Sequence, residues 1–239
     1  MKHNCDRFIE LCKNIDIELS EVQIEQFMDF YDLLIEKNKV MNLTAITEFD
    51  EVVEKHFIDS LCLAKYYNLE DVSNIIDVGT GAGFPGIPLK IAFPNINICL
   101  MDSLNKRIDF LREVGEKLNL SSIDYVHSRA EDLAHDKNYR EQYDLSVSRA
   151  VAKLSVLTEY CIPFVKPGGS FISYKSSDID EELKESSSAL KILNCEIENK
   201  YIYNIPGTEI GRSLISIKKL SSTNKKYPRK AGLPAKQPL

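Results

Sequence analysis

A cluster of glycines after a short apolar run is the segment of this sequence best suited to chemistry. Residues 75–91 read IIDVGTGAGFPGIPLKI, with four glycines within eight positions. A strand that ends in closely spaced glycines lets the backbone approach a ligand, and the helix that follows offers unpaired amides at its N-terminus. The segment therefore predicts a turn that holds a nucleotide-like cofactor.

Two glycine patterns overlap in this turn. Gly79, Gly81 and Gly83 form G-x-G-x-G, whereas Gly81, Gly83 and Gly86 form the G-x-G-x-x-G that is typical of dinucleotide binding. Asp102, at the end of the next apolar run, suits either cofactor because each presents a ribose diol there, although it could instead stabilise the start of the following helix. No G-x-x-x-x-G-K-[ST] occurs, which excludes a P-loop NTPase.

Three neighbouring features favour S-adenosylmethionine over a dinucleotide. Asp77 lies inside the first expected strand, where dinucleotide folds usually have an apolar residue. Ala130 and Glu131 follow the third strand, where an acidic side chain and a backbone amide can meet an adenine edge. The segment KPGG at 166–169 precedes the fifth strand. Over residues 70–220 these features resemble the class I S-adenosylmethionine-dependent methyltransferases.

The elements around the turn alternate between β-branched and amphipathic runs, which predicts a parallel sheet covered on both faces. The expected strands are 74–78, 97–102, 122–127, 143–148 and 170–175; the expected helices are 86–93, 104–118, 130–136, 152–163 and 178–193. Residues 195–205 and 213–220 then predict an antiparallel hairpin that closes the sheet. The fold class is thus α/β, a Rossmann-like methyltransferase fold with a mostly parallel sheet.

The residues before the sheet indicate a helical extension. Ser20 and Gln23 have the spacing of a capping box, and an apolar helical face follows them. A second helical run extends over 49–67. We expect a helical extension over 1–70, a methyltransferase domain over 71–220 and a basic, flexible tail over 221–239, because the tail is rich in Pro, Lys and Ser.

Composition limits the class of protein. Hydrophobic residues make up 44% and charged residues 28% of 239, and no stretch approaches the roughly 20 apolar residues of a membrane span. No secretory signal is evident at the start. The six cysteines are scattered without a C-x-x-C pair, which argues against a zinc site or a disulfide framework. We expect a soluble cytoplasmic protein without a metal.

The charge is strongly polarised along the chain. Residues 210–239 contain eight Lys and Arg and no acidic residue, so the net charge of −6 combines +8 in this segment with −14 elsewhere. A basic end of this kind is a candidate RNA contact, with Arg229, Lys230 and Lys236 as candidate phosphate-binding residues. A simpler interpretation is that this basic segment only increases the solubility of the protein.

The segment after the fourth strand bears on what is methylated. Amine methyltransferases commonly carry [DNS]-P-P-[YFW] there, whereas this chain reads SVSRAV over 146–151. Cys161 lies in an apolar helix end rather than in the Pro-Cys context of a pyrimidine C5 nucleophile. A target with an exposed lone pair, such as guanine N7, needs only alignment with the methyl donor. The lack of an evident general base agrees with that chemistry.

A closer resemblance spans essentially the whole chain. The segments that carry it are NLT (42–44), HFIDSL (56–61), DVGTGAGFPG (77–86), SRA (148–150), YPRKAG (227–232) and PAK (234–236). They resemble the bacterial small-subunit ribosomal RNA guanine-N7 methyltransferase family, also called glucose-inhibited division protein B. The resemblance implies S-adenosylmethionine as cofactor and a guanine in a decoding-region loop of 16S ribosomal RNA as target.

The resemblance also implies roles for individual residues. It places the cofactor against Gly79, Gly81, Gly83 and Phe84, with Asp102 at the ribose, Ala130 and Glu131 at the adenine, and Arg149 near the reacting end. Arg149 has an independent argument: at the carboxyl end of a central strand it faces the ligand crevice, where it could hold the cofactor carboxylate or guanine O6. It is therefore the candidate catalytic residue, in a positioning role.

Other candidates have two interpretations. Phe84 is either a core aromatic or a lid, and His56 with Asp59 is either a satisfied helix pair or part of an RNA groove. Lys106 and Arg107 lie on a solvated face or contact RNA phosphates.

Two other functions stay open at this point: a small-molecule or protein methyltransferase, and a non-catalytic ribosome-assembly module that binds RNA. The expected partner is 16S ribosomal RNA or the small subunit, without a membrane, and the chain is expected to be a monomer.

Overall fold

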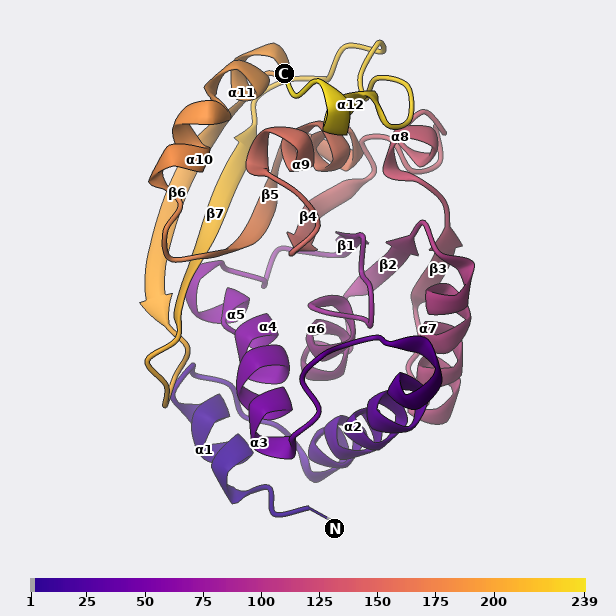
Figure 1. Cartoon of the computed structure of the whole chain (residues 1–239), viewed down its shortest axis with the longest axis vertical. Coiled ribbons are helices and arrows are strands. Elements are labelled where there is room, and N and C mark those ends of the chain that lie inside the picture. Colours follow the sequence, from indigo (N-terminus) through magenta and orange to yellow (C-terminus); the bar gives the residue numbers. More distant parts are fainter. Residues whose placement is uncertain (1–2) are drawn as a thin grey trace.

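A seven-stranded sheet runs through the centre of the computed structural model, which describes residues 3–239 (Figure 1). Its order is β3-β2-β1-β4-β5-β7-β6, in which the first five strands are parallel and β7 runs antiparallel to both β5 and β6. The strands are β1 (Asn74–Val78), β2 (Asn97–Asp102), β3 (Ile123–His127), β4 (Tyr143–Arg149), β5 (Val165–Ser176), β6 (Cys195–Asn204) and β7 (Gly211–Lys219).

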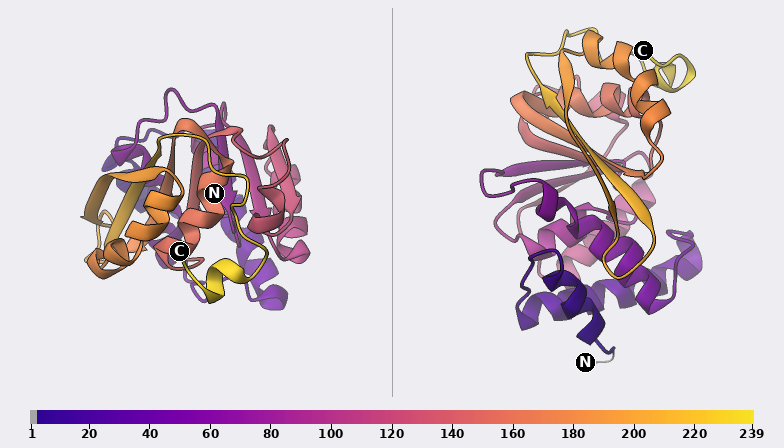
Figure 2. Two further views of the ribbon diagram at one scale, coloured as in Figure 1. Left: turned by 90° about the horizontal axis from the view of Figure 1, so that it is seen from above. Right: turned by 90° about the vertical axis from the view of Figure 1, so that its left-hand side faces the viewer.

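Helices cover both faces of the sheet and create two apolar cores. One core lies under α1 (Asp6–Lys13), α2 (Glu21–Met41), α3 (Phe49–Val52), η1 (Val53–Ile58), α4 (Asp59–Leu61), α5 (Leu63–Tyr66), α6 (Gly86–Ala92) and α7 (Asn105–Lys117). The other lies under α8 (Ala130–Leu133), α9 (Leu154–Cys161), η2 (Ile162–Phe164), α10 (Asp180–Glu185) and α11 (Ser187–Ile192). The two chain ends lie at opposite ends of the molecule (Figures 1 and 2).

The predicted alternation of strands and helices is confirmed, including the closing hairpin of β6 and β7. The capping box is also present: Ser20 Oγ accepts from the Gln23 amide, and Gln23 Oε1 accepts from the Ser20 amide. The strand expected at 170–175 begins earlier, at Val165, because Val165 pairs with Tyr143 across a register shift. The expected helix over 49–67 is divided into short segments, among which η1 is a π-helix.

The C-terminal residues pack against the domain, which corrects the expectation of a flexible tail. Arg140 donates from Nη2 to the carbonyl of Thr223 at 2.8 Å and from Nη1 to that of Tyr227 at 2.9 Å. Tyr227 is buried, and the short helix α12 (Leu233–Lys236) lies against α9 (Figure 1). Composition missed this because the carbonyls of a polar segment can be held by partners far away in the sequence.

Among residues 3–239, no helix is both long and apolar enough to cross a membrane. Within the same range, no cluster of three or more His, Cys, Asp or Glu has an arrangement that could hold a metal ion. All six cysteines are buried.

Candidate functional site

A cavity of about 680 Å³ opens at the carboxyl ends of β1, β2 and β4. This main cavity is lined by predicted site residues from five separate segments of the chain: His56, Gly79, Gly81, Phe84, Asp102, Arg107, Ala130, Glu131 and Arg149. In open α/β sheets ligands bind outside the carboxyl ends of the strands, where the strand order reverses, and β1 and β4 form that reversal here.

The glycine turn forms the floor of the main cavity. Gly79 and Gly81 have φ of +73° and +61°, which side chains other than glycine rarely adopt. A Cβ at Gly81 would meet nothing closer than a backbone oxygen at 4.0 Å, so it would project into open space. Asp77 fixes the turn from below, because its Oδ2 accepts from Thr80 Oγ1 at 2.7 Å and from the Gly86 amide at 2.9 Å.

Gly83 does not line the cavity, unlike its neighbours. Its φ is +98°, and a Cβ there would meet Ile87 at 2.7 Å and Leu111 at 2.8 Å. The predicted cofactor contact of Gly83 is therefore corrected: this glycine lets α6 and α7 pack closely behind the turn.

Burial changes the chemistry of Asp77. The carboxylate is fully buried, and this desolvation raises its pKa to about 7, opposed by the hydrogen bonds from Thr80 and Gly86. Its second oxygen, Oδ1, has no hydrogen-bond partner among the described residues. The positive charge of Arg149 lowers the pKa of Asp77, and the negative charge of Asp102 raises it.

Asp102 lies at the end of β2, as predicted, and points into the turn. Its Oδ2 accepts from the Gly81 amide at 3.0 Å and its Oδ1 from the Leu104 amide at 2.9 Å. Arg107 Nη1 lies 3.2 Å from Oδ2 and covers the carboxylate from the solvent side. The same Nη1 lies 3.4 Å from Oδ1, so a ribose hydroxyl that binds Asp102 would take the place of an Arg107 contact.

The far end of the main cavity is built from α8, α9 and the tail. Ala130 and Glu131 begin α8 and are both buried. Glu131 Oε1 accepts from the amide of Gly232 at 2.9 Å, and Gly232 lines the cavity beside Tyr160. The last residues of the chain thus contribute directly to the wall where an adenine was expected.

Arg149 lies at the opposite end of the main cavity, where it contacts residues from several segments. Its Nη1 donates to Asp59 Oδ2 at 2.9 Å and to the Lys55 carbonyl at 3.1 Å, while its guanidinium carbon lies 5.0 Å from the centre of the Phe84 ring. Phe84 is 5% exposed, so it serves as a core aromatic that supports Arg149 from below. The guanidinium therefore has a fixed position at the end of β4.

His56 faces this guanidinium as a neutral ring. Its Nδ1 lies 3.2 Å from Arg149 Nη2 and 3.1 Å from the Lys55 carbonyl oxygen, and its Nε2 lies 2.9 Å from Thr44 Oγ1. Burial, and then the positive charge of Arg149, lower the pKa of His56 to about 3. His56 and Asp59 thus do not pair with each other; both orient Arg149.

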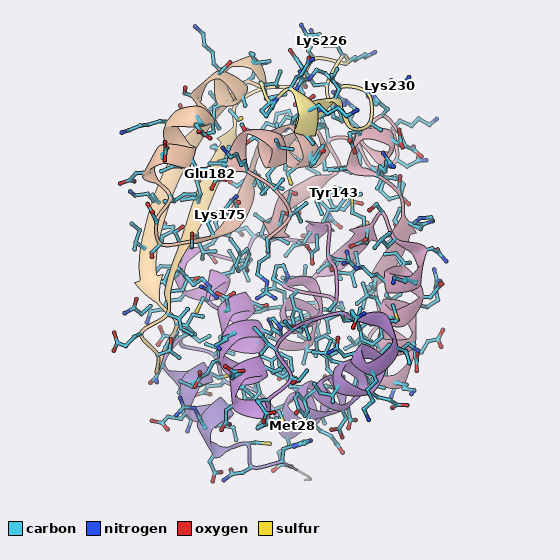
Figure 3. The ribbon with its side chains drawn as sticks, viewed as in Figure 1. Met28, Tyr143, Lys175, Glu182, Lys226 and Lys230 are labelled. Carbon is cyan, nitrogen blue, oxygen red and sulfur yellow. The ribbon has the colours of Figure 1, made fainter. Side chains whose placement is uncertain are left out.

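The loop after Arg149 bends sharply over the cavity. Ala150 has φ of +58°, a conformation that costs energy for a residue with a Cβ and is found preferentially at functional sites. Lys175 holds this loop by donating from Nζ to the Ala152 carbonyl at 2.6 Å, and it forms an ion pair with Glu182 (Figure 3). The loop is therefore tethered from β5 and α10.

The predicted RNA contacts divide into three groups. His56 and Arg107 line the main cavity, where they contact Arg149 and Asp102 respectively. Lys106, Lys230 and Lys236 are exposed, and Lys230 protrudes from the tail together with Lys226 (Figure 3). Arg229 is different: its Nη2 and Nε bind the buried carboxylate of Glu159, at 2.7 Å from Oε2 and 3.0 Å from Oε1. The predicted phosphate contact of Arg229 is corrected, because this guanidinium anchors the tail.

The wall residues that were not predicted as site residues include Thr44, Tyr160 and Gly232, and two of these three had a signal. Thr44 and Gly232 belong to segments that carried the family resemblance. Tyr160 had none, because only the fold brings α9 beside α8.

Comparison with known proteins identifies the family. The family described as rRNA small subunit methyltransferase G matches residues 23–206. A protein of Lachnoclostridium phytofermentans named Ribosomal RNA small subunit methyltransferase G is 52% identical over 232 residues, which cover 97% of this chain and 96% of that protein. This chain belongs to the rRNA small subunit methyltransferase G family. A member from Desulforamulus reducens with the same name is also 52% identical, over 96% of each chain.

Solved structures of other methyltransferases share the fold. The S-adenosylmethionine-dependent methyltransferase SibL aligns with a TM-score of 0.53 at 14% identity, over 67% of this chain and 54% of that one. A SAM-dependent O-methyltransferase from Thermotoga maritima aligns with a TM-score of 0.51 at 15% identity, over 80% and 73%. The predicted Rossmann-like methyltransferase fold is thereby confirmed.

S-adenosylmethionine is the cofactor of this family member, and the residues present fit it. The main cavity lies within the range of about 300–1,000 Å³ typical of ligand sites. The open space above Gly81 leaves room for close approach of a ligand, and Asp102 lines the main cavity, where a ribose hydroxyl can take the place of its Arg107 contact. Asp77, with its orphaned oxygen, lies under the floor that a sulfonium or an ammonium group would face.

Proposed function

We propose that this chain transfers the methyl group of S-adenosylmethionine to N7 of a guanine in a decoding-region loop of 16S ribosomal RNA. Family membership supports the substrate class, since the relatives are named for the RNA of the small ribosomal subunit. The chemistry has support from the site itself. At the Arg149 end, the two titratable side chains bound to Arg149, His56 and Asp59, are both engaged by its guanidinium.

His56 is the titratable ring at that end, and it cannot serve as a base. Both of its nitrogens have partners, and its pKa is lowered to about 3. Guanine N7 carries a lone pair and no proton, so its methylation requires none to be removed. A site that aligns donor and acceptor is sufficient, and such alignment can supply much of the rate enhancement.

In this proposal each group of residues has a separate role. The glycine turn and Asp102 bind the cofactor, whose sulfonium supplies an electrophilic methyl group when bound. Ala130, Glu131 and the tail enclose its adenine. Arg149, fixed by Asp59 and Phe84, orients the reacting groups. Lys230 and Lys236 would meet RNA phosphates near the tail.

A protein or small-molecule substrate is the second candidate, and nothing in the cavity wall favours it. We further propose that the chain acts in the cytoplasm, where ribosomal subunits are available, and as a monomer.

Transfer of labelled methyl groups tests the proposal. Small subunits from cells that lack the modification would be incubated with labelled S-adenosylmethionine, beside naked 16S ribosomal RNA, transfer RNA, DNA and bulk protein. Nucleoside analysis should give stoichiometric 7-methylguanosine in 16S ribosomal RNA at one position. Arg149→Met should abolish it, whereas Arg112→Met, a substitution of a half-exposed arginine on α7, should not. Label in protein alone would refute the RNA assignment.

A further inference from the structure

A second cavity of about 320 Å³ lies beside the main cavity, at the ends of β4 and β5. The two cavities share three wall residues, His56, Arg149 and Ala150. Of its wall residues, His56 and Asp59 were candidates for an RNA groove in the sequence. Its volume is at the lower end of the range for ligand sites, which suits one heterocyclic base rather than a whole nucleotide cofactor.

The wall of the second cavity contains a buried carboxylate between two guanidinium groups. Asp59 is 2% exposed; its Oδ2 accepts from Arg149 at 2.9 Å and its Oδ1 from Arg212 Nε at 3.2 Å. Each oxygen therefore retains a lone-pair position beyond the one in use. The carboxylate can therefore accept further hydrogen bonds, and the arginines beside it are fixed donors. Such a pair can recognise a planar ligand that carries both hydrogen-bond donors and acceptors.

We propose that the second cavity receives the target guanine after it has left its RNA stack, with Asp59 reading its Watson–Crick edge. The inference rests on the proposed function. Guanine offers N1–H and N2–H₂ as donors and O6 as an acceptor, which matches the carboxylate of Asp59 and the guanidinium of Arg149. Adenine offers an amino group where guanine has O6, so it would meet Arg149 donor to donor.

Arg149 lies between the two cavities, and its hydrogen bonds determine which edge of the target guanine stays unbound. A guanidinium commonly holds guanine through O6 and N7 together. Here its Nη1 is engaged by Asp59 and Lys55, and one Nη2 hydrogen faces His56. Nε donates to no partner among the described residues. In the proposed arrangement the remaining N–H groups of Arg149 donate to O6 alone, and the N7 lone pair is directed at the main cavity.

The transfer step then needs no proton acceptor. The N7 lone pair forms the new N–C bond while the C–S bond breaks and its electron pair stays on sulfur. The positive charge thereby passes from the sulfonium to the guanine ring, and no proton leaves. Asp59 carries a negative charge beside the ring on which this charge arrives, so it stabilises the transition state more than the neutral base.

The entrance of the second cavity agrees with extrusion of a base from RNA. Enzymes that modify a base reach it by taking it out of its stack and reading its Watson–Crick edge in a pocket. Ser176 lies exposed at the rim of this cavity, and Lys175 and Arg212 add positive charge around it. The strained Ala150 belongs to both walls, so the bend of its loop shapes both cavities together.

Binding without cofactor tests the recognition directly. Target-loop RNA would be labelled and titrated by fluorescence anisotropy, with either guanine or inosine at the methylated position. Inosine lacks only the N2 amino group, and the wild-type chain should bind it about tenfold more weakly. Asp59→Asn should bring the two affinities within about twofold. Asp180→Asn, the same change at an exposed ion pair on α10, should keep the discrimination.

A second variant covers the case in which Asp59→Asn folds poorly. Ser176→Trp fills the second cavity from its exposed rim, so it should abolish methylation and the preference for guanine while the affinity for S-adenosylmethionine stays unchanged. Ser188→Trp, at an exposed position on α11 outside both cavities, is its control.

The inference fails if wild-type protein methylates its guanine yet binds both RNAs equally, or if Ser176→Trp methylates normally. Absence of methyl transfer to any RNA by wild-type protein would instead contradict the proposed function.

Discussion

The glycine turn after β1 and the C-terminal tail line the same main cavity but are held by different kinds of interaction. The turn is fixed from within 10 residues, by glycines at positive φ and by the Asp77 contacts to Thr80 and Gly86. The tail is fixed across 70 residues or more, through Arg229 to Glu159 and Gly232 to Glu131. Local geometry creates one wall, and buried charge creates the other.

This difference determines how each wall can fail. A local turn is damaged by backbone strain or by lost space, with moderate effect on the rest of the fold. A wall anchored by a buried ion pair is damaged when one partner is removed, because the other charge stays buried and unpaired. Four predictions test this contrast, in order of expected effect.

Removal of the tail anchor should have the largest effect on stability. Arg229→Met leaves Glu159, whose side chain is 1% exposed, without its partner, and should lower the free energy of unfolding by about 3 kcal/mol or more. Urea denaturation measures this. The double variant Arg229→Met/Glu159→Leu should recover most of the loss. An unchanged midpoint in the single variant would mean that the tail is not anchored as described.

The buried carboxylate under the turn should make stability depend on pH. The pKa of Asp77 is raised to about 7 from 3.8, so between about pH 4 and pH 7 the folded chain keeps a proton that the unfolded chain has released. Its contribution to stability is complete below pH 4 and is lost as the pH rises through 7. Relative to Asp77→Asn, the wild-type protein should therefore lose stability over this range in urea titrations. Parallel pH curves would contradict the raised pKa.

Loss of space above the turn should weaken cofactor binding more than folding. Gly81→Ala adds a Cβ at φ +61° that projects into the cavity, and should raise the Kd for S-adenosylmethionine about tenfold or more by calorimetry. Gly168→Ala is a matched control, because it has φ of +86° with nothing within 4 Å and lies outside the main cavity. Both should lose about 1 kcal/mol of stability, and only the first should lose affinity.

The exposed lysines of the tail should show the smallest effect. If Lys230 and Lys236 each neutralise one phosphate, replacing both by Ser should flatten the slope of log K against log salt by about 1.4. Affinity for S-adenosylmethionine should not change, since neither lysine lines the main cavity. An unaltered slope would assign RNA binding to other residues.

The same contrast explains what the sequence could reveal. The strands, the glycine turn and the position of Asp102 follow from periodicity and from residues close together in the chain, and the structure has them as expected. Gly83 was misassigned because its pattern matches its neighbours while its Cβ position faces α7. A glycine pattern tells where the backbone turns, and only packing tells which side of the turn a ligand can reach.

The charged residues were harder to interpret. Arg229 was predicted to bind RNA from the composition of the tail, whereas its partner Glu159 lies 70 residues earlier. Asp59 and Arg212 meet around Arg149 from distant segments, and no spacing indicates that meeting. Long-range pairing between opposite charges leaves no periodic signal, so these roles needed the fold.

The aromatic residues of the N-terminal helices have a consequence for how the chain can be divided. Phe8 packs on Phe27 and Phe27 on Phe57, with ring centres 4.9 and 5.1 Å apart, and Phe30 packs on Phe84 of the glycine turn at 5.3 Å. These side chains belong to the same apolar core as β1 and α6.

The helical extension and the sheet should therefore unfold in a single cooperative transition. A fragment that begins near residue 70 would expose one side of Phe84, and with it the support of Arg149. The boundary that the change of pattern suggests near residue 70 is thus a boundary in the sequence only, and an autonomous catalytic domain cannot be cut out there.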